Sequence, residues 1–219
     1  MPTIRILDGL NFEGARLVYH RGIDAPALPV HYRQGDLDRA CGPYAVIVAL
    51  SACGVPIDQK RVLKALKFIA AGDALLSKGT RISDLRRFVQ QLDPATSLER
   101  VRGTPVEMFA CTHVKIWEEH QPVLLCLSDR TRELHHWVVA IGSGFPHAGA
   151  SEERPAVGPD RLLVLDPAAL APRTSYWNGI LTRLRQPGPL RFDYLTEDGL
   201  RENVRIDEAY SVVRAEEGW

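Results

Sequence analysis

CGPYAVIVALSA, residues 41–52, is the first strong helical pattern in the chain. The stretch is apolar almost all round, which predicts a helix buried in the core rather than one lying on the surface. Pro43 is tolerated in the first turn of a helix, because the N–H group that proline lacks would have no partner there. Gly54 is suited to ending the helix. Cys41 is therefore expected at the amino-terminal end of a buried helix.

The patterns that follow this helix change from helical to extended along the chain. Apolar residues at three- and four-residue spacing predict three further helices, at Asp58 to Ala70, Ile82 to Gln91 and Pro105 to His120. Strands are predicted at Thr3 to Leu7, Val123 to Leu127, His135 to Ile141, Arg161 to Leu165, Leu190 to Tyr194, Asn203 to Ile206 and Ser211 to Arg214. Helices followed by strands predict an α+β fold, with a helical half packed on an antiparallel sheet.

Length and composition indicate a single globular domain spanning residues 1–219. Lys plus Arg and Asp plus Glu both number 27, so the net charge gives no electrostatic reason to expect nucleic acid as a partner. No apolar run is long enough to span a membrane, and the first residues lack a secretory pattern, so we expect a cytoplasmic protein. Residues 143–160 are rich in Gly, Pro, Ala and charge, and are predicted to form a surface loop insertion.

The four cysteines form no Cys-x-x-Cys pair, so we expect neither a disulfide framework nor a zinc site. All four are expected to be free thiols. We expect no metal and no cofactor. Cys53, Cys111 and Cys126 lie in apolar contexts, where cysteine is usually a small buried hydrophobe. Cys41 differs, because the positive end of a helix dipole stabilises a thiolate and the free N–H groups there can bind an oxyanion.

A base and an orienting group follow Cys41 in the chain. His135 and His136 begin a predicted strand, and alternation places them on opposite faces, so only one of them can face Cys41. The next strand ends in Asp166, whose carboxylate could fix the tautomer of the histidine ring. The residues alone leave the choice of histidine open.

Other polar residues receive simpler interpretations. Asp36 and Asp38, just before Cys41, are interpreted as caps of its helix rather than as ligands for a cationic group. The remaining histidines considered are expected to be solvated or capping residues: His31, His113, His120 and His147.

Four parts of the chain follow one another in a recognisable order: Gln34, Cys41-Gly42-Pro43-Tyr44-Ala45, His136-Trp137-Val138-Val139 and Val164-Leu165-Asp166-Pro167. Together they resemble the C39-like family of papain-fold cysteine peptidases. The resemblance covers the chain from Gln34 to Asp166. It implies a papain-like fold with Cys41 as nucleophile, His136 as base and Asp166 as its orienting group. It also implies that Gln34 helps to bind the oxyanion.

The expected function is that of a thiol protease or amidohydrolase, which cleaves a peptide or isopeptide-type amide through a Cys41 thioester. The partner is then a peptide or protein substrate. Two alternatives stay open: an inactive module that binds a peptide or protein, and an acyltransferase or transglutaminase-like enzyme that uses the same thioester.

Overall fold

A computed structural model describes residues 4–22, 25–34, 40–69, 80–129, 135–145, 159–173, 175–184 and 192–215. The described helices are α1 Cys41–Ala52, α2 Gln59–Ile69, α4 Ile82–Leu92 and α5 Pro105–Trp117. The strands are β1 Ile4–Ile6, β2 Leu10–Glu13, β3 Arg16–Tyr19, β4 Leu28–Pro29, β5 Thr96–Arg100, β6 Val123–Ser128, β7 His135–Gly144, β8 Arg161–Leu165, β9 Gly179–Arg183, β10 Phe192–Thr196 and β11 Arg201–Arg214.

Six antiparallel strands form a closed barrel in the order β7-β6-β11-β10-β9-β8, and the pairing of β8 with β7 completes the ring. β1 adds to β7 outside the ring, and β5 adds to β11. The expected papain-like α+β fold, with a helical half packed on an antiparallel sheet, is therefore wrong. Alternating apolar residues look alike in an open and a closed sheet, so the sequence pattern could not show that the first and last strands pair.

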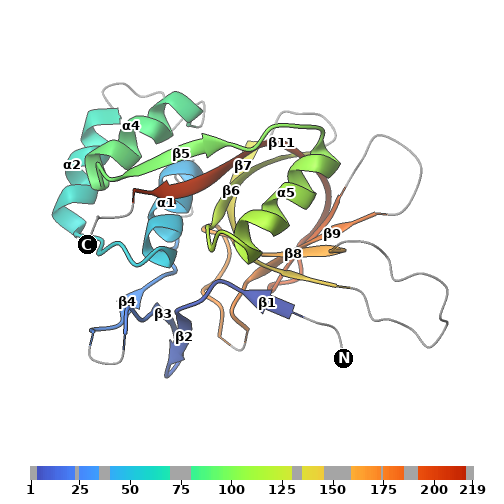
Figure 1. The fold of residues 1–219 in the computed structure, drawn as a ribbon, viewed down its shortest axis with the longest axis horizontal. Helices are drawn as coiled ribbons and strands as arrows, with labels where there is room; N and C mark the ends of the chain where they lie inside the picture. Colours follow the sequence, from blue (N-terminus) through green and yellow to red (C-terminus); the bar gives the residue numbers. More distant parts are fainter. Residues whose placement is uncertain are drawn as a thin grey trace.

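The helices occupy two separate places around the barrel (Figure 1). α1 packs against β7 and β6 on one side and against α4 on the other, while α2 packs on α4. α5 lies elsewhere, against β11 and β7, and strand β5 separates it from α4 along the chain. The helices thus do not form the single half that their order along the chain suggested.

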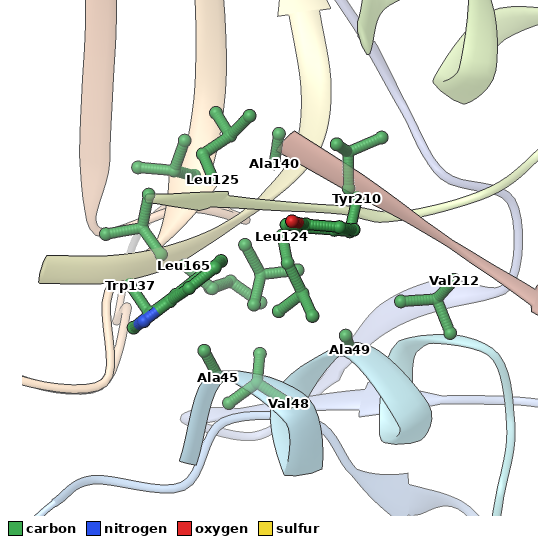
Figure 2. Packing of buried hydrophobic residues seen from close by; sticks show 14 of the residues in the cluster. Ala45, Val48, Ala49, Leu124, Leu125, Trp137, Ala140, Leu165, Tyr210 and Val212 are labelled. Carbon is green, nitrogen blue, oxygen red and sulfur yellow. The ribbon is translucent and has the colours of Figure 1, made fainter. Parts of the chain in front are cut away.

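The prediction for the helix that begins at Cys41 is confirmed, because α1 spans Cys41–Ala52 and all of its residues except Tyr44 are buried. Figure 2 shows Ala45, Val48 and Ala49 on the side of α1 that faces the barrel residues, among them Leu124 and Trp137. The opposite side packs on α4. Apolar side chains are needed on both sides, which explains why the helix has no polar face.

Two glycines allow neighbouring side chains to pack closely against the two ends of α1. Gly54 follows the helix with a φ of +74°, and a Cβ atom there would lie 2.4 Å from the Tyr19 ring. This backbone conformation favours glycine, so Gly54 ends the helix as predicted. A Cβ atom on Gly42 would lie 3.0 Å from side-chain atoms of both Leu85 and Thr80. Glycine after Cys41 therefore lets α4 and the segment before it pack against the start of α1.

Several strand boundaries differ from the predicted ones. β11 is one continuous strand that includes both predicted strands at the carboxyl end of the chain. β5 and β9 were not predicted, and neither was the small sheet of β2, β3 and β4. Ser143 and Gly144 belong to β7 rather than to the predicted loop, and residues 146–158 of that loop lie outside the described residues.

Within the described residues, no helix has both the length and the apolar character needed to cross a membrane.

Replacing Leu50 by Ala tests whether α1 is the helix around which the core packs. Leu50 is fully buried, so Leu50→Ala should lower the free energy of unfolding by about 2–5 kcal/mol. Leu63→Ala on α2 is a matched control, because that side chain is 53% exposed and its loss should cost well under 1 kcal/mol. Denaturant unfolding measures both values, and similar small losses in the two variants would contradict this packing.

Candidate active site

Cys41, His136 and Asp166 come from three elements that meet at one end of the barrel. Cys41 is the first residue of α1, His136 is the second residue of β7, and Asp166 directly follows β8. β7 and β8 are antiparallel, with Val139 opposite Leu165, so the end of β8 lies beside the beginning of β7. The strand pairing thus brings Asp166 to His136 although 29 residues separate them in the chain.

The His136 ring links the other two side chains. Its Nε2 lies 2.7 Å from Asp166 Oδ1, and the Cys41 side chain also interacts with the ring and raises its pKa. Since an imidazole has only two nitrogens and Nε2 contacts Asp166, Nδ1 remains available to exchange a proton with the Cys41 sulfur. The ring is half-buried, whereas Asp166 is only 3% exposed. This arrangement can transfer a proton between sulfur and imidazole while a buried carboxylate fixes the ring.

Asp166 is itself held by three hydrogen-bond donors. Besides the histidine, the Ala168 amide donates to Oδ1 at 2.7 Å and the Tyr194 hydroxyl donates to Oδ2 at 2.5 Å. The Ala168 contact is a short turn of the kind that aspartate forms with its own backbone. Tyr194 reaches the carboxylate from β10, on another part of the barrel. Both carboxylate oxygens are therefore occupied, and the side chain has one stable orientation.

The backbone of Asp166 is held by Asn178, which lies just before β9. Asn178 Oδ1 accepts from the Asp166 amide at 2.6 Å, and Asn178 Nδ2 donates to the Asp166 carbonyl at 2.9 Å. Through these two bonds the Asn178 side chain acts like a strand backbone and extends the β8–β9 pairing by one residue. His31 Nε2 lies 3.0 Å from the same carbonyl. The expectation that His31 is solvated or capping is therefore wrong.

The charges of the histidine and the aspartate stabilise each other. Burial lowers the pKa of His136, but hydrogen bonds to Asp166 and Cys41 outweigh it and raise that pKa to about 10. Burial raises the pKa of Asp166, but the His136 hydrogen bond and charge, with Tyr194 and Ala168, hold it below its usual value. Because the pKa of His136 is raised, its interactions stabilise the fold below pH 6.5, and that stabilisation is lost as the pH rises to about 10.

A cavity of about 770 Å³ exposes this group of side chains. It is lined by Cys41, His136, Asp166 and Gln34, so all four predicted site residues lie on one cavity. The Gln34 backbone amide donates to the Pro167 carbonyl at 2.9 Å, which fixes this segment beside the end of β8. Gln34 Oε1 is buried and has no hydrogen-bond partner.

The start of α1 offers backbone donors near the Cys41 sulfur. The side chain of the residue before the helix, Ala40, makes no capping hydrogen bond. The amides of Cys41 and Gly42 lie in the first turn, where N–H groups have no partner within the helix. Asp36 and Asp38, predicted as caps, lie outside the described residues.

The other three thiols have different environments, and all four cysteines are free as predicted. Cys126 also lines the cavity, but burial together with the charges of Glu208 and Asp207 raises the pKa of its thiol. Burial raises the pKa of Cys53 to about 12. Cys111 is exposed, so the expectation that it is a buried hydrophobe is wrong. Of the two cavity thiols, Cys41 is the one that raises the pKa of His136.

His135 lines the same cavity but contacts other side chains. Its Nδ1 lies 3.8 Å from the Cys126 sulfur and 3.7 Å from Asp207 Oδ2. The structure thus places His136 and not His135 between Cys41 and Asp166, which agrees with the choice made from the family resemblance.

Two further histidines were expected to be solvated or capping residues. His113 instead contacts Ser143 Oγ at 2.8 Å and packs on the Trp117 ring. His120 is exposed and lies 3.2 Å from Asp8. His147 lies outside the described residues.

The sequence patterns do not identify Tyr194, Asn178 and His31 as site residues. Tyr194 falls in a predicted strand, but nothing in a strand pattern shows which strand will face a given loop. Asn178 and His31 lie in segments without regular structure and have no motif around them. A buried carboxylate does require several donors, so the placement of Asp166 could have prompted a search for them.

Comparison with models of known protein families finds no match for this chain, and comparison with curated proteins finds no relative. Within the part of the chain that the structure describes, no group of three or more His, Cys, Asp or Glu residues is arranged to hold a metal ion.

Removing the carboxylate at position 166 tests the link between the two strands. Asp166→Asn should lower the pKa of His136 by at least about one pH unit, because the largest interaction that raises it is lost. The chemical shifts of the His136 ring across a pH titration measure this value. Asp193→Asn is a matched control, because the Asp193 carboxylate binds Arg201 instead. An unchanged pKa in Asp166→Asn would contradict the described contact.

Proposed function

We propose that this chain is a cysteine hydrolase that cleaves amide bonds in peptide-like substrates, with Cys41 as the nucleophile. One observation carries the proposal. A cysteine at the start of a buried helix shares one cavity with a histidine that a buried carboxylate holds at 2.7 Å, and both the cysteine and the carboxylate raise the pKa of that histidine. A base that is held by a third group is what an activated nucleophile requires.

The reaction begins with proton transfer from the Cys41 sulfur to His136 Nδ1. The thiolate then attacks the substrate carbonyl, and the new oxyanion accepts hydrogen bonds from the α1 backbone amides. Gln34 Nε2 is a further donor to this oxyanion, because the Gln34 side chain lines the same cavity. His136 gives its proton to the leaving amine, and a thioester to Cys41 remains.

Hydrolysis of the thioester uses the same side chains in the reverse order. His136 removes a proton from a water molecule, which attacks the thioester carbonyl and releases the acyl group and the thiolate. Asp166 keeps the ring in one orientation throughout and stabilises its charged form. Tyr194 and Asn178 act one step further away, since they hold Asp166 and do not reach the reacting atoms.

The motif resemblance to C39-like peptidases supports the same roles for Cys41, His136, Asp166 and Gln34. It rests on the motifs around these residues, since the helical half expected from that family is not present. The proposal therefore depends on the geometry of the site. A thioester also permits transfer to an amine, and hydrolysis is the reaction proposed for this site.

Alkylation by iodoacetamide tests the reactivity of Cys41. At pH 6 ordinary thiols are mostly protonated and react slowly. Cys41 should be modified faster than Cys53, Cys111 and Cys126, and His136→Ala should slow its modification by about tenfold or more. Peptide mapping by mass spectrometry gives the rate at each thiol.

His113→Ala is the matched control, because His113 contacts Ser143 and does not line the cavity. It should leave the rate at Cys41 unchanged. Slow modification of Cys41, at a rate equal to that of Cys111 and independent of His136, would refute the proposed function and favour a module that only binds its partner.

A further inference from the structure

Part of the cavity wall carries carboxylates that the proposed reaction does not use. Asp129 directly follows β6, and Glu202 and Glu208 lie on β11; all three line the cavity. Asp129 and Glu208, together with Ser128, the last residue of β6, form what we call the acidic wall; Glu202 lies six residues before Glu208 on β11, about 20 Å away along the strand, and is not part of it. Among the described residues of the lining, Arg81 is the side chain with a permanent positive charge. The acidic wall thus makes one part of the cavity electronegative.

Ser128 is an independent sign that this wall receives a ligand. The residue is only 2% exposed, and its hydroxyl oxygen is buried without a hydrogen-bond partner in the protein. A buried hydroxyl without a partner costs free energy, so such groups in native proteins call for an explanation. Ser128 lines the cavity, where a ligand that donates a hydrogen bond would satisfy it.

A bulge in β11 places Glu208 in the wall. The register between β11 and β6 shifts between Ile206 and Glu208, so Asp207 is the extra residue and Glu208 lies opposite Cys126. The Asp207 carboxylate binds the Arg205 guanidinium. The Glu208 carboxylate accepts one hydrogen bond from the Tyr210 hydroxyl at Oε2, at 3.0 Å. Its negative charge acts within the cavity, since it contributes to the raised pKa of Cys126.

We propose that the acidic wall binds a primary ammonium group of the substrate, supplied by a lysine side chain or by a free amino terminus. The inference rests on the proposed function, because it names the substrate class of the same site. An ammonium has three donors that point in different directions. The acceptors of the wall come from two strands and include a hydroxyl, which suits that geometry better than the planar fork of a guanidinium.

Three thiol reagents that differ in charge test this proposal at Cys41. Methyl methanethiosulfonate is neutral, the 2-aminoethyl reagent is cationic and the 2-sulfonatoethyl reagent is anionic. Each forms a disulfide with a thiolate and releases methanesulfinate. Peptide mapping gives the rate at each thiol, and the exposed Cys111 is an internal reference. The ratio of the cationic to the neutral rate should be at least about fivefold higher at Cys41 than at Cys111.

Isosteric variants assign the preference to the wall. Glu208→Gln and Asp129→Asn each remove one charge and should reduce the ratio at Cys41 by about threefold. Asp129 follows β6 and does not lie within a strand, so its variant keeps the test valid if Glu208→Gln fails to fold. Glu99→Gln is the matched control, because Glu99 is exposed on β5 and does not line the cavity. It should leave the ratio unchanged.

The two sources of an ammonium group are separated by protection of Cys41 from the neutral reagent. Nα-acetyl-lysinamide carries the side-chain ammonium, leucinamide carries the α-ammonium, and Nα-acetyl-norleucinamide is the uncharged control. Protection by either cation beyond that of the control supports the proposal and identifies the source. Protection by neither cation, or protection equal to that of the control, contradicts it.

Equal charge ratios at Cys41 and Cys111, or a ratio that neither Glu208→Gln nor Asp129→Asn changes, would also overturn the acidic wall as an ammonium site. The proposed function would survive that result if Cys41 still reacted fast with the neutral reagent in a manner that depends on His136. Loss of this dependence would instead remove the function on which the inference rests.

Discussion

The pairing of β7 with β8 is the constraint on which the rest of the structure depends. It closes the six-stranded barrel, and it also places Asp166 beside His136 at the end of the two strands. The 2.7 Å contact between these side chains is therefore a consequence of the barrel geometry. Without closure, the carboxylate and the imidazole would belong to opposite edges of an open sheet.

In the proposed reaction, the residues around this contact divide into those that react and those that hold them in place. Cys41 is placed by α1, whose apolar surface packs on β6 and β7 and so fixes the helix start against the barrel. Asp166 accepts hydrogen bonds on both carboxylate oxygens. The Asn178 side chain forms hydrogen bonds with both the backbone amide and the backbone carbonyl of Asp166. Such complete bonding fixes the position of Asp166 and, through the 2.7 Å contact, that of the His136 ring.

The sequence allowed prediction of features that depend on local patterns. The helix beginning at Cys41 follows from apolar residues, a proline in the first turn and a glycine at the end. His136 and Asp166 could be placed at strand ends because the strands also follow from local patterns. The family motifs selected His136 over His135. The fold itself could not be predicted, because closure depends on which strands pair, and a strand pattern does not contain that information. The contact of Tyr194 with Asp166 could not be predicted for the same reason, since Tyr194 reaches Asp166 across the barrel.

The central claim is that Cys41 forms an acyl-enzyme with the help of His136, and p-nitrophenyl acetate tests it most directly. Rapid mixing should give a burst of about one equivalent of p-nitrophenolate per chain, followed by slower turnover. Mass spectrometry after acid quenching should place the acetyl group on Cys41, and His136→Ala should abolish the burst. Absence of a burst, or acetylation of Cys111 as fast as that of Cys41, would contradict the account.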